Sequence, residues 1–197
     1  MRNAPPSGDG WYYSIKAETV RVMVADGLGH GINANRIVLQ LIRQMNWLCK
    51  RSHEFPGIAE CLHDLDKQMK ALNQQGAQSA IALADINAER KEINIAGIGN
   101  IVSCCFYQGE IHYFPTMNGM IGGRMPGHIQ IHQHITQQPA LLAMFTDGLN
   151  SRIAQDYLLR LSTSSRLKNH NVQLIANQVV RTARSLNDDA SCAVMLI

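Results

Sequence analysis

The sequence predicts an α+β domain in which an antiparallel β-sheet packs together with helices on its outside. Predicted strands follow one another across short turns, at 11–16 with 19–26 and at 101–107 with 110–114. Such hairpins indicate antiparallel pairing. Two helical segments follow the first strand pair, so strands and helices do not alternate as a parallel sheet requires. Because no linker or repeat interrupts residues 1–197, we expect a single domain.

The first half of the chain is predicted to form two strands, two helices and a further hairpin. The second helix has the clearest pattern, because its apolar residues repeat at steps of three and four. These residues are Ile58, Leu62, Leu65, Met69 and Leu72. The expected segments are, in order, strands 11–16 and 19–26, a helix from about residue 33, a helix from residue 58, and strands 78–86 and 91–96.

The second half is predicted to be mainly strands, with two helices near its end. Alternation of isoleucine with polar residues indicates an edge strand, and an unbroken apolar run indicates a buried strand. The expected segments are strands 101–107 and 110–114, an irregular loop 118–127, an edge strand 129–135, a buried strand 140–145, helices 153–161 and 172–186, and a last strand 190–197.

Composition excludes several classes of protein. Hydrophobic residues make up 46% of the chain, too many for a disordered protein, and the longest apolar run (140–145) is too short to cross a membrane. The net charge of +3 does not indicate a nucleic-acid binder. Five cysteines, an odd number without a CxxC motif, favour a reducing compartment. With no apolar leader at the N-terminus, we expect a cytoplasmic protein.

The aspartates are the most informative residues. Asp9 lies in a glycine-rich turn before a strand, and Asp188 lies between a helix and a strand. Asp26 and Asp147 each end a predicted strand and precede a glycine. Carboxylates at strand ends can converge at one edge of a sandwich, where they would repel one another unless cations lay among them. Oxygen ligands favour Mg²⁺ or Mn²⁺. The alternative is that Asp-Gly is simply a common turn dipeptide.

Four short motifs resemble those of the metal-dependent PPM-type (type 2C) serine/threonine phosphatases. In order they are Ser7-Gly8-Asp9, Ala25-Asp26-Gly27-Leu28-Gly29-His30-Gly31, Phe145-Thr146-Asp147-Gly148-Leu149-Asn150 and Asn187-Asp188-Asp189-Ala190-Ser191. The resemblance extends from Ser7 to Ile197 and is greatest to the SpoIIE-like branch, in particular its RsbX-like stressosome members. It implies a four-layer α-β-β-α sandwich of two antiparallel sheets flanked by helices, the PPM phosphatase fold.

The resemblance also implies a site for two divalent cations, Mn²⁺ or Mg²⁺. Asp9, Asp26 and the carbonyl of Gly27 would hold one ion. Asp26, Asp147 and Asp188 would hold the other, so that Asp26 bridges both ions and is a catalytic residue. Two ions can activate a water and neutralise the phosphoryl oxygens, so no protein nucleophile is needed.

The sequence departs from the family pattern in two places. Animal and plant members usually carry histidine two residues after the bridging aspartate, where this chain has Leu28. His30 is our candidate general acid; alternatively, it only begins a helix. The family's first strand normally begins well before the first motif, but only six residues precede Ser7. The first strand is therefore either short or incomplete, and a missing strand would expose the sheet edge beside Asp9.

Three other features of the sequence each allow two interpretations. The family motif favours Asp188 over Asp189 as the ligand, although the reverse assignment stays open. Arg124 in the glycine-rich loop is either a partner for phosphate or a solvated surface residue. Three histidines alternate with isoleucines and suggest either zinc ligands or, in our preferred interpretation, the polar face of an edge strand. They are His128, His132 and His134.

The resemblance implies a phosphatase that acts on serine or threonine of a phosphorylated STAS-domain protein in a stressosome-type module, as negative feedback. We expect a monomer with no nucleic-acid or membrane partner. The stretch 117–128 and the segment 151–171 are the candidate recognition surface. Four metal-bound aspartates would leave eleven acids against eighteen bases, a basic surface that would attract a phosphoprotein. The alternatives are a binding module with this fold and little turnover, and an enzyme for small phosphoesters.

Overall fold

The computed structural model describes residues 6–72, 76–136, 139–164, 167, 170–185 and 189–197. Thirteen elements lie within these residues. They are β1 Asp9–Lys16, β2 Thr19–Gly27, α1 Gly31–Lys50, α2 Ile58–Leu72, β3 Ser79–Asn87, β4 Glu92–Ile98, β5 Val102–Tyr107, β6 Glu110–Phe114, β7 His132–Ile135, β8 Leu141–Phe145, α3 Ser151–Ser162, α4 Val172–Val180 and β9 Cys192–Leu196.

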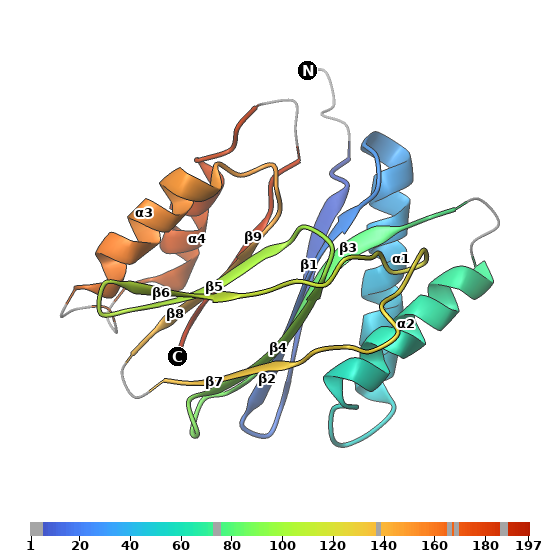
Figure 1. The fold of residues 1–197 in the computed structure, drawn as a ribbon, viewed down its shortest axis with the longest axis horizontal. Helices are drawn as coiled ribbons and strands as arrows, with labels where there is room; N and C mark the ends of the chain where they lie inside the picture. The colour runs from blue at the N-terminus through green and yellow to red at the C-terminus, as the bar shows by residue number, and fades with distance from the viewer. Residues whose placement is uncertain (1–5, 73–75, 137–138, 165–166, 168–169, 186–188) are drawn as a thin grey trace.

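Two antiparallel sheets face each other, and a pair of helices covers the outside of each (Figure 1). The first sheet has the order β1-β2-β3-β4-β7 and carries α1 and α2. The second has the order β6-β5-β8-β9 and carries α3 and α4. Every strand pairing is antiparallel. The predicted four-layer sandwich is therefore confirmed.

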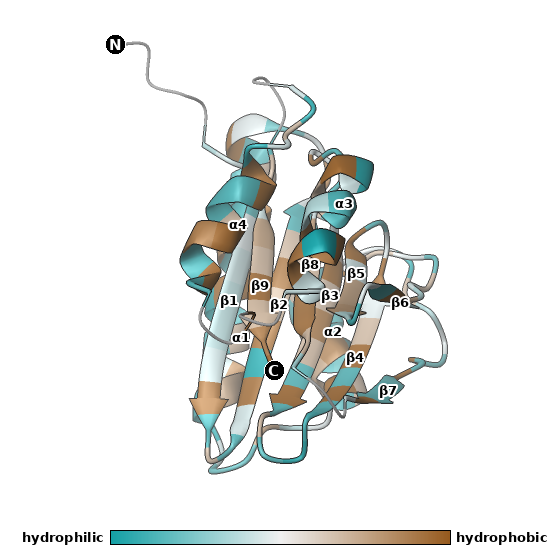
Figure 2. Ribbon diagram, turned by 90° about the vertical axis from the view of Figure 1, so that its left-hand side faces the viewer, coloured by the Kyte–Doolittle hydropathy of each residue, from teal (hydrophilic) through white to brown (hydrophobic). Residues whose placement is uncertain are grey.

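Apolar residues fill the three spaces between these four layers (Figure 2). Strand β8 contributes side chains to two of these spaces, because neighbouring side chains of a strand point to opposite faces. Leu142 and Met144 lie between the two sheets, whereas Leu141 and Phe145 pack beneath α3 and α4. The uninterrupted apolar run that predicted a buried strand is explained by burial of both faces.

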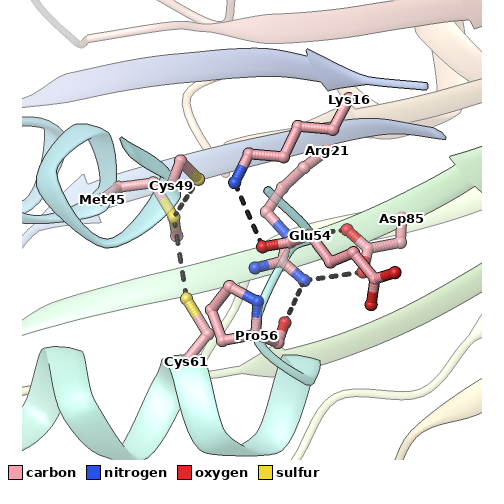
Figure 3. Close-up of polar contacts among 8 residues, drawn as sticks. All are labelled: Lys16, Arg21, Met45, Cys49, Glu54, Pro56, Cys61 and Asp85. Atoms are coloured by element: carbon pink, nitrogen blue, oxygen red, sulfur yellow. Dashed lines mark hydrogen bonds and ion pairs between the residues drawn. The ribbon is translucent and has the colours of Figure 1, made fainter. Parts of the chain in front are cut away.

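Strand β2 is also buried on both faces, and one of them contains a charged residue. Arg21 is fully buried and forms a two-point ion pair with Asp85 of β3, with both N···O distances 2.7 Å. It also donates to the carbonyl oxygen of Pro56 over 2.6 Å (Figure 3). Lys16 donates nearby to the carbonyl of Glu54. The carbonyl contacts attach the connection between α1 and α2 to the first sheet, whereas the ion pair joins β2 to β3 within it.

The predicted elements agree with the structure except at their ends. Helix α1 begins at Gly31, not near residue 33, and His30 occupies its N-cap position. Helix α4 ends at Val180, and β7 covers only 132–135 because 129–131 follow an irregular path. Strand β1 starts at Asp9 and forms an edge of its sheet. None of the helices over the described residues has the length and apolar character needed to cross a bilayer.

Candidate active site

A pocket of about 620 Å³ opens at the end of the sandwich where β1 begins and β2 ends. Four aspartates from separate parts of the chain line it, together with the loop before α1 and two loops of the β4–β7 region. The lining residues are Asp9, Asp26, Gly27, Leu28, Gly29, His30, Gly99, Asn100, Asn118, Gly119, Met120, Asp147 and Asp189. The predicted convergence of strand-end carboxylates is thus present for Asp9, Asp26 and Asp147.

Asp9 is the buried member of this group, with 9% of its surface exposed. The pairing of β1 with β2 places it directly opposite Asp26. The Thr146 hydroxyl donates a hydrogen bond to its Oδ2 over 2.6 Å. Burial raises the pKa of Asp9 to about 6; the Thr146 hydrogen bond opposes this rise, and the negative charge of Asp189 adds to it. A cation at this position would relieve both the burial cost and the repulsion.

The backbone around Asp26 is held by short contacts that require glycine. The Ser79 hydroxyl donates to the Asp26 carbonyl oxygen over 2.8 Å, and the Gly27 N–H donates to the Gly8 carbonyl over 3.0 Å. A Cβ on Gly27 would lie 2.6 Å from the carbonyl oxygen of Ala34 in α1, closer than any side chain tolerates. The glycine therefore lets the end of β2 pack directly against the first turn of α1.

Asp147 and Asp189 are brought to the same pocket from the second sheet. Asn100 donates to Oδ2 of Asp147 over 2.8 Å. The Gly8 N–H donates to Oδ2 of Asp189 over 2.6 Å, which connects the segment before β9 to the start of β1. A Cβ on Gly148 would lie 1.8 Å from the backbone oxygen of Asp189. Asp-Gly at this position thus reflects close packing of two backbones as well as turn geometry.

The predicted ligand Asp188 lies outside the described residues. Its neighbour Asp189, the alternative ligand, lines the pocket. Within the described part of the chain, no three His, Cys, Asp or Glu side chains are close enough together to hold an ion. Thr146, Asn100 and the Gly8 amide each hold one of the carboxylates in a hydrogen bond. The donors that face the pocket are nevertheless carboxylate, amide and carbonyl oxygens, the types that suit Mg²⁺ and Mn²⁺.

The other predicted residues divide between the pocket and the surface. His30 lines the pocket, as does Leu28, which is 53% exposed. The exposed Arg124 is not among the lining residues; its backbone oxygen accepts from the Met120 N–H and shapes the loop. His134 stacks on His112 of β6 with ring centroids 4.3 Å apart.

Sequence reasoning missed the polar residues that hold the carboxylates. Thr146 and Asn100 were not expected to contact aspartates, because their partners, Asp9 and Asp147, lie far from them along the chain. The position of Thr146, directly before a strand-end aspartate, was the available signal. All five cysteines are free thiols, and burial raises the pKa of the Cys61 thiol to about 12. None of the five lines the pocket.

The chain matches the family model of Stage II sporulation protein E (SpoIIE) over residues 16–196. It belongs to the SpoIIE family. Solved structures support the fold: RsbX in complex with magnesium superimposes with a TM-score of 0.73 at 21% identity, over 98% of this chain and 88% of that one. A serine/threonine phosphatase of S. agalactiae gives 0.79 at 14% identity, over 100% and 94% of the two chains.

A chain from work on the bacterial stressosome, described as a modular system adapted to control secondary messenger signalling, is also similar to this SpoIIE-family chain. Its TM-score is 0.72 at 18% identity, over 100% of this chain and 94% of that one. No curated protein matches the chain in a sequence comparison. The prediction of a PP2C-type phosphatase domain of the SpoIIE branch is confirmed at the level of family and fold.

Proposed function

We propose that this chain is a metal-dependent phosphatase that removes phosphate from serine or threonine of a regulatory protein. The observation that carries the proposal is the pocket in which the buried Asp9 faces Asp26, Asp147 and Asp189. A cation among these carboxylates would offset the burial and the repulsion that disfavour the charged form of Asp9. Membership of the SpoIIE family and the likeness to RsbX with magnesium support the same assignment.

In this proposal Asp9, Asp26 and the Gly27 carbonyl hold one ion, and Asp26, Asp147 and Asp188 hold the other, with Mn²⁺ or Mg²⁺ as the metal. When bound, the ions supply an activated water and neutralise the charge of the phosphoryl group. The chain's own residues orient the ligands: Thr146 holds Asp9, and Asn100 holds Asp147.

His30 is the proposed proton donor to the leaving oxygen. It lies in the pocket wall at the N-cap of α1, and its side chain does not cap that helix, so the imidazole is available to a bound phosphoester. Its variant His30→Gln would slow turnover of a phosphoserine substrate, which has a poor leaving group. The same variant would hardly change turnover of p-nitrophenyl phosphate, whose leaving group needs no proton.

The proposed substrate is a phosphorylated STAS-domain protein of a stressosome-type module, on which the enzyme acts as negative feedback in the cytoplasm. The similarity to RsbX and to the chain from the stressosome work supports this choice. Because the pocket is open and lies between loops, a folded phosphoprotein can present its phosphorylated residue to it. Residues 117–128 and the segment 151–171, which includes α3, remain the candidate recognition surface.

The deciding assay measures release of p-nitrophenol from its phosphate ester as Mn²⁺ is added, for the parent and for Asp26→Asn. We expect metal-dependent activity in the parent and at least a 100-fold loss in the variant. A parent protein that binds manganese, as measured by calorimetry, but shows no metal-dependent turnover would overturn the enzyme proposal. It would favour the second candidate, a binding module of this fold, to which the leucine at position 28 lends some support.

A further inference from the structure

The outward face of α1 combines exposed apolar residues with positive charge. Ile32, Leu39 and Trp47 are large apolar side chains that are 58%, 44% and 49% exposed. Arg36 and Arg43 lie between them and are exposed as well. Steps of four, three, four and four residues place these five side chains on one narrow stripe of the helix. We call these five residues the α1 stripe.

The face of α1 opposite the stripe packs in the core and attaches the helix to the sheet. The stripe takes no part in that attachment. Residues such as Ile37, Leu41, Met45 and Leu48 are buried in the core beneath the first sheet. Single apolar residues are common on protein surfaces and need no explanation. Several exposed apolar residues gathered on one surface, in contrast, mark an interaction site. The α1 stripe is therefore a surface that packing among the described residues does not explain.

Charge on α1 is of one sign only. Its 20 residues include no aspartate or glutamate, whereas Arg36, Arg43 and Lys50 are cations and Arg51 follows at the C-cap. The Arg51 guanidinium lies over the Trp47 ring, 4.4 Å from its centroid. A surface of this kind is complementary to an acidic partner with an apolar face.

The stripe leads directly to the catalytic pocket. The helix begins at Gly31, next to His30 in the pocket wall, and Ile32 lies in its first turn. From Ile32 to Trp47 the stripe extends about 22 Å, the length of about four helical turns. A partner seated on it would have one end beside the four aspartates and the proposed ions.

We propose that the α1 stripe is the docking surface for the phosphoprotein substrate, and that it binds an acidic amphipathic helix of that protein. The apolar side of the partner helix packs on Ile32, Leu39 and Trp47, and its carboxylates pair with Arg36 and Arg43. This inference rests on the proposed phosphatase function, which it extends from the reacting group to the recognition of the protein that carries it. It adds a helix surface to the two loops predicted from the sequence.

Binding can be tested without any catalysis. The chain has two tryptophans, so Trp11→Phe leaves Trp47 as the sole indole emitter. The probe is a synthetic three-heptad helical peptide without tryptophan, with leucine along one face and glutamate on the others. We expect a saturable change of Trp47 emission whose midpoint rises at least tenfold between 0.05 and 0.5 M NaCl, since salt screens the charge pairs.

Charge reversal tests whether peptide binding depends on the arginines of the α1 stripe or only on the net charge of the protein. Arg36→Glu/Arg43→Glu should weaken peptide binding at least tenfold. Arg90→Glu/Arg181→Glu is the matched control, because it makes the same charge change at two exposed positions outside α1 and the pocket. Equal loss in both variants, or no saturable signal, would overturn the proposal. So would a Trp47 response only to anionic lipid vesicles, or only to rising concentration of the protein itself.

Turnover distinguishes failure of docking from failure of the proposed function. With a serine-phosphorylated STAS-domain protein as substrate, the α1 reversal should raise KM at least tenfold and leave kcat unchanged. Hydrolysis of p-nitrophenyl phosphate should be the same in parent, reversal and control. Normal turnover of the phosphoprotein by the α1 reversal would overturn the docking proposal. A parent inactive on both substrates would overturn the phosphatase proposal, and the peptide titration would still decide on the stripe.

Discussion

The hydroxyl of Thr146 donates a hydrogen bond to Oδ2 of Asp9 over 2.6 Å and joins residues 137 positions apart in the chain. It connects the end of β8 in one sheet to the start of β1 in the other. Thr146 also accepts from the Ser191 N–H over 3.0 Å, so one hydroxyl ties three segments of the pocket together.

Replacing Thr146 by valine keeps the shape of the side chain but removes its hydroxyl. We expect Thr146→Val to lose about 1–3 kcal/mol of unfolding free energy, because a buried carboxylate and an amide lose their partner. Metal-dependent hydrolysis of p-nitrophenyl phosphate should fall at least tenfold. Urea unfolding and the assay under Proposed function measure the two effects. Thr136→Val is the control, since the Thr136 hydroxyl is buried with no hydrogen-bond partner among the residues that the structure describes; a comparable loss there would contradict this account.

Asp9 makes the stability of the metal-free protein depend on pH. Burial raises the pKa of Asp9 from 3.8 to about 6, so the folded protein holds this proton more tightly than the unfolded chain does. The contribution of Asp9 to the unfolding free energy is therefore full below about pH 3.8 and is lost as the pH rises through 6. Asp9→Asn should therefore be more stable than the parent at pH 8, by about 1–2 kcal/mol after allowance for solvent screening. At pH 4 the two should be equal. Thermal unfolding in chelator measures both; a variant less stable than the parent at pH 8 would refute the prediction.

Gly148 is predicted to tolerate no side chain. A Cβ there would meet the backbone oxygen of Asp189 at 1.8 Å, so Gly148→Ala must displace the segment before β9. We expect a loss of about 1–3 kcal/mol of stability and at least a tenfold loss of metal-dependent activity. Gly127→Ala is the matched control, because no described atom beyond its two chain neighbours lies within 4 Å of its added Cβ. Wild-type activity in Gly148→Ala would show that Asp189 need not be held in place.

The ion pair of Arg21 with Asp85 is predicted to matter for stability and not for chemistry. Arg21→Met leaves Asp85 without its partner and should cost about 3–5 kcal/mol of unfolding free energy. Arg21→Met/Asp85→Leu should recover at least half of this loss, because no charge then remains unpaired. Activity per folded molecule should stay within twofold of the parent in both. Urea denaturation of the parent, Arg21→Met, Asp85→Leu and the double variant measures the coupling energy between the two side chains. Losses of stability that simply add in the double variant would contradict the prediction.

His134 gives the fold a second pH dependence. Burial, and then the neighbouring His112, lower the pKa of His134, and Tyr107 is the other titratable group in contact with its ring. A lowered pKa means that the folded state favours the neutral His134 ring. The contribution of this ring to the unfolding free energy is therefore full above about pH 6.5 and is lost as the pH falls. In His134→Phe the loss of stability between pH 7.5 and 5.5 should be smaller than in the parent. An unchanged slope of stability against pH in His134→Phe would refute the assignment.

The order of elements could be predicted because it depends on local patterns. The apolar run of β8 predicted a buried strand, and apolar residues at steps of three and four defined α2. Ends were less well predicted: α1 begins at Gly31 with no side-chain cap hydrogen bond, and the nearby contact that local patterns could not predict is the close approach of Gly27, the last residue of β2, to Ala34.

The sequence by itself determined the α+β class, the hairpins and the aspartates placed at strand ends beside glycine. Only the tertiary structure decided which of these carboxylates share a pocket, that Thr146 and Asn100 hold two of them, and that Arg21 is fully buried against Asp85. The physical reason is distance along the chain. Side-chain alternation and turn chemistry act over a few residues, whereas the pocket forms where two separately paired sheets and the start of α1 meet.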